Sequence, residues 1–211
     1  LSKVISIGEN AFSGDILYEY LDQDLSTTAV DENGYDLYRY YAPKFVSVDL
    51  SSAEKIGKDA FAYCRELKTV TLGDAIPEGA FRYCSSLTSI NLGKVVKIAD
   101  YAFNRSAITS LTLDSAVEIG KFAFLESAAL TSVTFSESIE KIDEGAFAYC
   151  GLLASANGLG GVEHVGDYAF AYTGINGDFT TPDTLIDIGD YAFAFAKLKQ
   201  VDLSNVVNIG N

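Results

Sequence analysis

The chain has 211 residues, of which 48% are apolar, and it carries a net charge of −14. That apolar content is enough for a continuous core and excludes disorder over most of the length. The excess of acidic groups repels nucleic-acid backbones and anionic membrane surfaces, so we expect neither as a partner. No uncharged apolar run approaches the roughly 18 residues of a membrane span, and the first residues lack a signal-peptide pattern. An export signal or anchor is therefore expected outside this segment.

The first recurring feature of the chain is the phrase I-G-x-x-A-F. Clear copies begin at Ile56, Ile119 and Ile188, and a further copy begins at Ile209 and is cut off. Looser copies occupy 7–12, 76–81, 98–103, 142–147 and 165–170. From the second copy on, the phenylalanines that end the phrase are spaced 20 to 23 residues apart. A fixed short period of this kind predicts stacked repeats.

The stretch 13–45 separates the first copy from the second by more than one period. The step from Phe12 to Phe61 is 49 residues, which leaves about 26 residues beyond one coil. The stretch has a local charge of −5, from two basic and seven acidic residues, and six tyrosines: Tyr18, Tyr20, Tyr35, Tyr38, Tyr40 and Tyr41. Two compatible interpretations remain open. One is a β-hairpin with its turn at Asn33-Gly34, and the other is a recognition loop whose tyrosines bind a partner.

A second phrase lies between the copies of the first and places apolar residues at i, i+3 and i+5. It occupies 67–72, 87–92, 108–113, 130–135 and 198–203. Its last three residues alternate as in a half-buried strand. The I-G-x-x-A-F segment is too short for a free-standing helix. We therefore expect each coil to hold one strand, a tight turn and a single helical turn.

Neighbouring coils must share one core, because a lone coil of about 22 residues cannot bury its apolar face. We expect the strand residues Val70, Ile90, Leu111 and Val133 to line up across the coils. The phenylalanines are expected to form a parallel aromatic spine, with Phe61, Phe81, Phe103 and Phe124 as members. The glycine of the phrase is expected to supply a turn that a side chain would hinder, which makes substitution of Gly57 costly.

Two coils depart from the pattern. At 153–158 the apolar strand positions weaken to Ala and Gly, and at 175–179 an aspartate falls near an inward position. Glycine weakens a strand and often marks a bulge, so we expect a bulge or a register shift at both places. Repeat decay and a ligand notch are the two interpretations of such a defect.

The sequence offers little catalytic or metal chemistry. Its one histidine, His164, falls at a repeat position that holds Lys141 and Glu118 in other coils, so we expect an ordinary surface residue. Cys64, Cys84 and Cys150 share a position that elsewhere holds Ser, Thr or Ala, which predicts buried packing. There is no C-x-x-C, no H-E-x-x-H and no calcium loop. We therefore predict no catalytic residue, no metal, no cofactor and no enzyme activity.

The strand phrase followed by I-G-x-x-A-F-x-x-C resembles the BspA-like leucine-rich repeats of bacterial surface proteins. The resemblance covers 1–12 and 46–211. It implies an α/β repeat protein: a right-handed leucine-rich-repeat solenoid with a parallel β-sheet on the concave face and short helical or irregular turns on the convex face. It also implies one domain over 1–211, with about eight to nine coils and the insertion or degenerate repeat at 13–45. Family members with known roles are mostly adhesins.

Strand residues that point away from the core are expected to tile one open, polar sheet. With the six tyrosines, the candidate ligand contacts are Asp49, Thr69, Thr71, Asn91, Thr112 and Thr134. The leading hypothesis is an extracellular or cell-surface binding module, adhesin-like, whose partner is a host or microbial surface or matrix protein, or a glycan. The alternative is a structural spacer without a ligand of its own. The chain begins and ends within a repeat, so we also expect its uncapped ends to permit end-to-end association.

Overall fold

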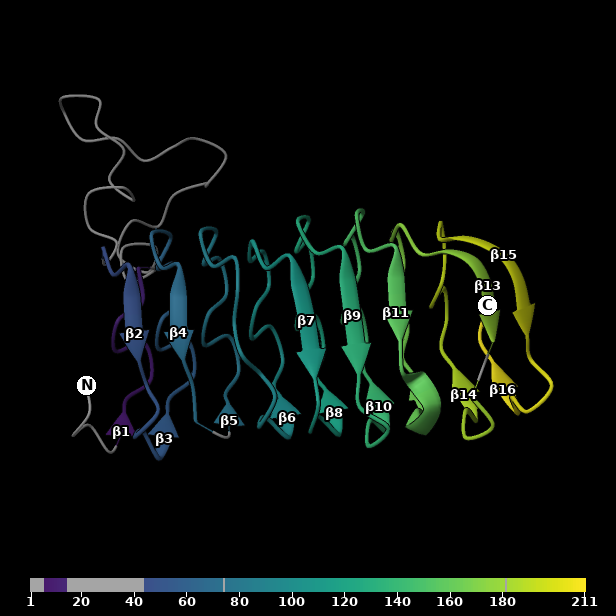
Figure 1. The fold of residues 1–211 in the computed structure, drawn as a ribbon, viewed down its shortest axis with the longest axis horizontal. Helices are drawn as coiled ribbons and strands as arrows, with labels where there is room; N and C mark the ends of the chain where they lie inside the picture. Colours follow the sequence, from purple (N-terminus) through teal and green to yellow (C-terminus); the bar gives the residue numbers. More distant parts are fainter. Residues whose placement is uncertain (1–5, 15–43, 74, 181) are drawn as a thin grey trace, which may run out of the picture.

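The structure is a computed structural model, and it describes residues 6–14, 44–73, 75–180 and 182–211. These residues form a parallel β-solenoid of stacked coils. Figure 1 shows the coils following one another along the long axis, with the longer strands side by side and the short strands in a second row. Strand pairing is parallel throughout the described part of the chain, as expected when each coil repeats the path of the one before.

The short strands come from the I-G-x-x-A-F phrase and form the more continuous of the two rows. They are β1 (Ser6–Ile7), β3 (Lys55–Ile56), β5 (Ala75–Ile76), β6 (Lys97–Ile98), β8 (Glu118–Ile119), β10 (Lys141–Ile142), β12 (His164–Val165), β14 (Asp187–Ile188) and β16 (Asn208–Ile209). The last seven pair in order as one sheet, while β1 pairs with β3. In each of these pairs an isoleucine or valine lies beside its counterpart, as Ile142 lies beside Val165.

The longer strands come from the second phrase, and their sheet is broken. They are β2 (Ser47–Asp49), β4 (Thr69–Thr71), β7 (Ser110–Leu113), β9 (Ser132–Phe135), β11 (Ser155–Asn157), β13 (Asn176–Thr180) and β15 (Lys197–Asp202). They pair as β2-β4, as β7-β9-β11 and as β13-β15. The strand predicted at 87–92 does not form. The expectation of one continuous sheet is therefore wrong.

The first break lies beside an unusually short turn. Three residues separate Leu72 from Ile76, whereas five separate Leu50 from Ile56 and Leu92 from Ile98. A hollow of about 480 Å³ lies beside this turn, lined by Ser51 and its neighbours in one coil and by Gly73 and Lys97 in later coils.

Of the short helical or irregular turns expected on the outer side, the helical ones do not form in the described part of the chain. Among the described residues the only helix is the 3-10 turn η1 (Leu159–Gly161). In place of a helix, the amides of Phe61 and Tyr63 donate to the carbonyls of Ala80 and Arg82 in the next coil, at 2.9 and 2.8 Å. A helix would use these N–H groups within its own segment. The α/β description is therefore wrong. Besides its two rows of strands, the solenoid has a third side made of turns that are hydrogen-bonded from coil to coil.

The two irregular coils differ from each other. In the pair β13-β15 the register shifts between Gly177 and Asp178, which confirms the irregularity predicted at 175–179. In the earlier coil, β11 keeps regular pairing with β9, with Ser155 opposite Ser132, so the shift predicted at 153–158 is wrong. The irregularity there comes after the strand, at Gly158, whose φ is +83° and which leads into η1.

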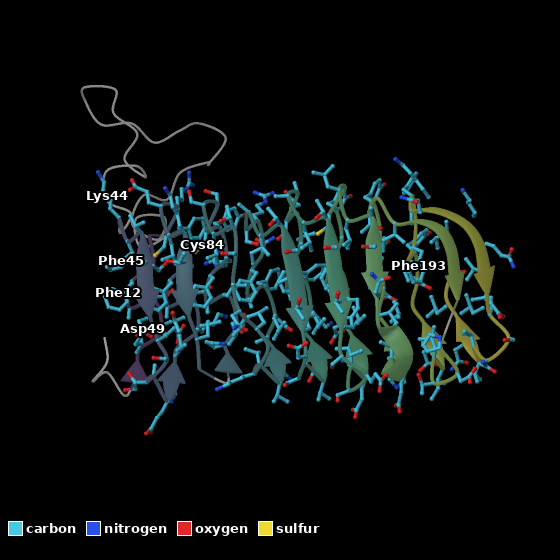
Figure 2. All side chains as sticks on the ribbon, viewed as in Figure 1. Phe12, Lys44, Phe45, Asp49, Cys84 and Phe193 are labelled. Atoms are coloured by element: carbon cyan, nitrogen blue, oxygen red, sulfur yellow. The ribbon has the colours of Figure 1, made fainter. Side chains whose placement is uncertain are left out.

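The predicted aromatic spine is confirmed. Successive rings from Phe12 to Phe193 stack with centroids 5.2 to 5.6 Å apart. Figure 2 shows these two residues at opposite ends of the stack. The expected alignment of strand residues is confirmed in part: Leu111 lies opposite Val133, and both are buried, as is Val70. Ile90 lies in the coil that forms no strand and is only partly buried. Parallel rings at this spacing fill the core without a gap between coils.

Gly57 is required for a reason other than the predicted turn. Its φ is not positive, since the positive-φ glycines of the described chain are Gly79, Gly145 and Gly158. A Cβ at Gly57 would instead lie 2.3 Å from the backbone nitrogen of Glu9 in the preceding coil. The glycine allows two backbones to approach closely, which a turn argument from sequence does not reveal.

Replacing Gly57 by alanine should destabilise the protein, because the two coils must separate to admit the methyl group. We expect a loss of about 1–3 kcal/mol in the free energy of unfolding, measured by urea denaturation. Gly8 holds the same repeat position, and a Cβ added there would meet no atom within 4 Å. Gly8→Ala is therefore the matched control, and equal losses from the two substitutions would contradict this explanation.

Replacing Phe103 by alanine should cost about 3–5 kcal/mol, because it empties one rung of the spine. Phe103 is fully buried, whereas Phe195 is 72% exposed. Phe195→Ala should therefore change the free energy of unfolding by less than about 1 kcal/mol. Urea denaturation measures the free energy of unfolding of both variants. A small loss in that free energy for Phe103→Ala would show that the spine is not the main source of stability.

Candidate functional site

The outward positions of the longer strands form exposed rows in register. Thr69 lies opposite Ser47, and Thr71 lies opposite Asp49. All four are exposed, while the intervening Val48 is buried. We call the outward side of the longer strands the sheet face. Figure 2 shows Asp49 on the first of these strands.

The same arrangement recurs in the middle of the stack. Thr112 on β7 lies opposite Thr134 on β9, and both are exposed. Asn91 is exposed as well but lies in the coil that lacks a strand, between the two sheet segments. The predicted contacts therefore fall into two groups. Asp49, Thr69 and Thr71 lie together on β2 and β4, Thr112 and Thr134 lie together on β7 and β9, and Asn91 lies between the groups.

Two of the predicted ligand contacts, Asp49 and Asn91, also stabilise backbone turns through their side chains. The Oδ1 atoms of Asp49 and Asn91 each accept a hydrogen bond at 3.0 Å, from the backbone N–H of Ser51 and of Gly93 respectively. The bond from Ser51 also holds the pKa of Asp49 below its usual value. Such turns, in which an Asp or Asn side chain bonds two residues ahead, were readable in the sequence as D-L-S and N-L-G. Sequence reasoning assigned these side chains to a ligand and missed this role.

The six predicted tyrosines of the insertion, from Tyr18 to Tyr41, lie outside the described residues. The described residues on either side of the insertion are anchored in the first coils. Gly14 donates its N–H to the carbonyl of Ala62 at 2.9 Å. Phe45 packs edge-on against Phe12 with centroids 5.4 Å apart, and Figure 2 shows the two side by side. The insertion therefore leaves and rejoins a packed part of the solenoid.

The cysteines are buried, as predicted. Each thiol donates to the carbonyl of a spine phenylalanine from an earlier coil, at 3.2 to 3.3 Å. Ser127 makes the same kind of bond, to the carbonyl of Phe103 at 3.1 Å. The position therefore holds a small residue, which in these four coils donates a hydrogen bond. Desolvation raises the pKa of Cys64 and of Cys150 to about 12, and raises that of Cys84 as well.

His164 occupies a surface position on β12, as predicted. It lies in register between Lys141 and Asp187, and its Nδ1 is 2.7 Å from the Asp187 carboxylate. The hydrogen bond from Asn208 is the largest cause of a lowered pKa at Asp187, with His164 adding to it. These residues form one row of polar contacts between coils. Among the described residues there is no group of three or more His, Cys, Asp or Glu side chains placed to hold a metal ion.

The outer turns carry two rows of residues that sequence reasoning missed. The first ladder is the residue before the alanine of each phrase and includes Asp59, Gly79, Tyr101, Phe122, Gly145, Tyr168 and Tyr191. The second ladder lies two residues after the phenylalanine and consists of Tyr63, Tyr83, Arg105, Glu126, Tyr149, Tyr172 and Phe195. Every described member of both has a positive φ, between 52° and 62°. The recurring F-x-Y of the sequence was the available signal for the second ladder.

Side chains of the second ladder stack from coil to coil on the surface. Tyr63 and Tyr83 stack at 4.5 Å, and the Arg105 guanidinium lies 5.0 Å from the Tyr83 ring centroid. Arg105 pairs in turn with Glu126 at 2.8 Å. A left-handed conformation costs a residue with a side chain on the order of 1 kcal/mol. Stacking and the cross-coil hydrogen bonds offset that cost.

Comparison with known families tests the resemblance directly. The family model described as "BspA type Leucine rich repeat region (6 copies)" matches residues 1–74, 54–176 and 163–211. The chain belongs to this family. The BspA-type repeats thus include the first ladder, the second ladder and the sheet face, since the matches run the length of the chain.

Solved structures share the fold of this BspA-type chain. A T. pallidum leucine-rich repeat protein is 25% identical, with a TM-score of 0.61 over 80% of this chain and 70% of its own. A leucine-rich cell surface protein of Faecalibacterium prausnitzii is 18% identical, with a TM-score of 0.53 over 95% and 65%. A Bacteroides ovatus leucine-rich repeat protein is 20% identical over 79% and 57%, with a TM-score of 0.49. The chain spans between 57% and 70% of the length of these proteins.

Among curated proteins, none matches the BspA-type chain significantly. Within the ranges that the structure describes, no helix is long and apolar enough to cross a membrane.

The burial of the three thiols predicts that the native protein does not react with a thiol reagent such as dithiobis(nitrobenzoic acid) at pH 8. Their raised pKa values leave very little thiolate, and the fold blocks access. After denaturation in guanidinium chloride all three should react, as read from absorbance of the released thiolate. Rapid reaction of a native thiol would contradict the buried-packing role.

Proposed function

We propose that this BspA-type chain is a binding module of a bacterial cell-surface protein, which holds a host or microbial surface protein against the sheet face and the insertion. The observation that carries the proposal is the set of exposed rows in register on the sheet face, with Thr69 and Thr112 as members. Repeat scaffolds commonly use such extended surfaces for recognition.

The chemistry of the sheet face suits a protein partner. Its middle segment is uncharged: the rows there contain Ser110, Ser132 and Ser155 in one line and Thr112, Thr134 and Asn157 in the next. Hydroxyl and amide groups can donate and accept hydrogen bonds along an extended partner without the desolvation cost of a buried charge. The rows are rigid, because the alternate residues Leu111 and Val133 are packed in the core.

The insertion supports the same proposal from a different direction. Tyrosine offers a large contact area at low entropic cost, and this stretch concentrates six of them beside seven acidic residues. Gly14 and Phe45, which flank the insertion on either side, are both held by contacts with the solenoid.

The test is binding of the protein to an array of extracellular-matrix and bacterial-surface proteins. A second protein has residues 15–43 replaced by a short glycine-serine linker. A third carries Thr112→Glu and Thr134→Lys, a pair whose opposite charges avoid repulsion across the strands. Its matched control carries Ser85→Glu and Ser138→Lys, at exposed positions away from the longer strands.

We expect a specific hit with the unaltered protein, weakened about tenfold or more by the sheet-face pair, by the deletion or by both, and retained by the control pair. Loss in only one of the two altered proteins assigns the contact to that surface. If no array member binds, or if binding survives both alterations, the proposal fails and the chain is better explained as a spacer.

A further inference from the structure

A notch opens on the outer turns, on a different side of each coil from the sheet face. It has a volume of about 320 Å³ and lies where the first ladder has Gly79 in place of a large side chain. Ligand pockets span roughly 300–1,000 Å³, so the notch suits a single small ring. The Asp59 carboxylate lies over this glycine, since a Cβ added at Gly79 would be 2.0 Å from Asp59 Oδ1.

The glycine leaves one face of Tyr101 without a ring partner. Phe122 stacks on the far side of Tyr101, with centroids 5.2 Å apart. On the near side the first ladder has Gly79, so the ring borders the notch, and Tyr101 is 38% exposed. An aromatic face with negative charge density attracts the positively polarised C–H groups of a ring laid against it.

Charges around the notch are paired and cancel. Lys58 pairs with Glu78 at 2.8 Å, and Arg82 pairs with Asp59 at 2.6 Å. The Arg82 guanidinium also donates to the Tyr63 hydroxyl at 2.9 Å. Two cations against two anions leave no net charge to select an ion. The pairs instead hold donors and acceptors in fixed positions around the opening.

Asn104 supplies a buried acceptor at the notch. The residue is 5% exposed, and its Nδ2 donates to the carbonyl of Leu125, in the coil that lies away from Gly79. Asn104 lines the notch, and no described side chain or backbone group donates to its amide oxygen. A buried acceptor is rarely left without a donor in a native protein.

We propose that the notch binds a neutral pyranose, with one face of the sugar on Tyr101 and its hydroxyls on Asn104 and the paired charges. A sugar ring combines apolar C–H faces with hydroxyls at the rim, which matches one aromatic face surrounded by fixed donors and acceptors. An anion or a cation would gain nothing from the cancelled charges. The site is distinct from the sheet face, so it stands whether or not the proposed protein partner exists.

The test is saturation-transfer NMR of the protein with the methyl glycosides of glucose, galactose, mannose and N-acetylglucosamine, repeated with the corresponding free sugars. Methyl glycosides represent the end of a glycan chain, and the free sugars represent monomers. Tyr101→Gly removes the ring with little risk to folding, since glycine occupies the same first-ladder position at Gly79 and Gly145 with a positive φ. Tyr168→Gly is the matched control: Tyr168 also follows a glycine on this ladder and is 44% exposed, but at that glycine, Gly145, the Phe122 ring occupies the place of a side chain.

We expect at least one sugar to bind, with affinity reduced about tenfold by Tyr101→Gly and unchanged by Tyr168→Gly. A glycoside that binds while its free sugar does not identifies the glycan end as the source. The proposal is overturned if no sugar binds, if Tyr101→Gly binds like the unaltered protein, or if both substitutions reduce binding equally. Binding of N-acetyl-tyrosinamide in place of any sugar would also overturn it, in favour of a partner's aromatic side chain.

Discussion

Each coil can bury its apolar side only against the coils above and below it. The rest of the structure depends on this constraint. It explains why the spine rings stack at 5.2 to 5.6 Å and why the thiol of Cys84 finds its acceptor on Phe61 in the coil before. It also explains the close approach at Gly57, since coils held this tightly leave no room for a Cβ. The phenylalanine rings, the cysteine thiols and the glycines each match the residues of the neighbouring coil in size and position.

The same constraint orders the outside of the protein. A residue that repeats in each coil becomes a row, so the threonines of the sheet face and the tyrosines of the outer turns are brought into line by the core. A single departure then has a local and predictable effect. A hollow lies beside the short turn after Leu72, and Gly79 in place of a large side chain exposes the face of Tyr101. Candidate sites on this protein are therefore found where the repeat is interrupted.

The repeat itself could be predicted from the sequence because its period is carried by many copies of one phrase. The spine, the buried cysteines and the surface position of His164 follow from that period alone. The outer turns could not be predicted in this way, because a segment such as Gly57 to Cys64 has the composition of a helical turn. Its N–H groups are used by the next coil, which is a non-local effect.

The candidate site was predicted less completely than the fold. Alternation along the strands placed Thr69 and Thr112 outward correctly, yet the coil of Asn91 has the same alternation and forms no strand. The notch depends on residues from three coils, Asp59, Gly79 and Tyr101, whose meeting is a matter of stacking register. Short-range sequence patterns do not reveal which residues of different coils meet. The recurring F-x-Y did indicate that the outer turns present aromatic side chains beyond those of the core.

Native-state hydrogen exchange tests the central claim, that contact between coils holds the protein together, most directly. The amide of Phe103 bonds to Ala123 in the next coil at 2.8 Å, as that of Phe124 bonds to Ala146. If stacking is the source of stability, these amides exchange only when coils separate, and their protection is lost together in the Phe103→Ala protein. Exchange of the Phe103 and Phe124 amides at the rate of an unstructured peptide would contradict the account.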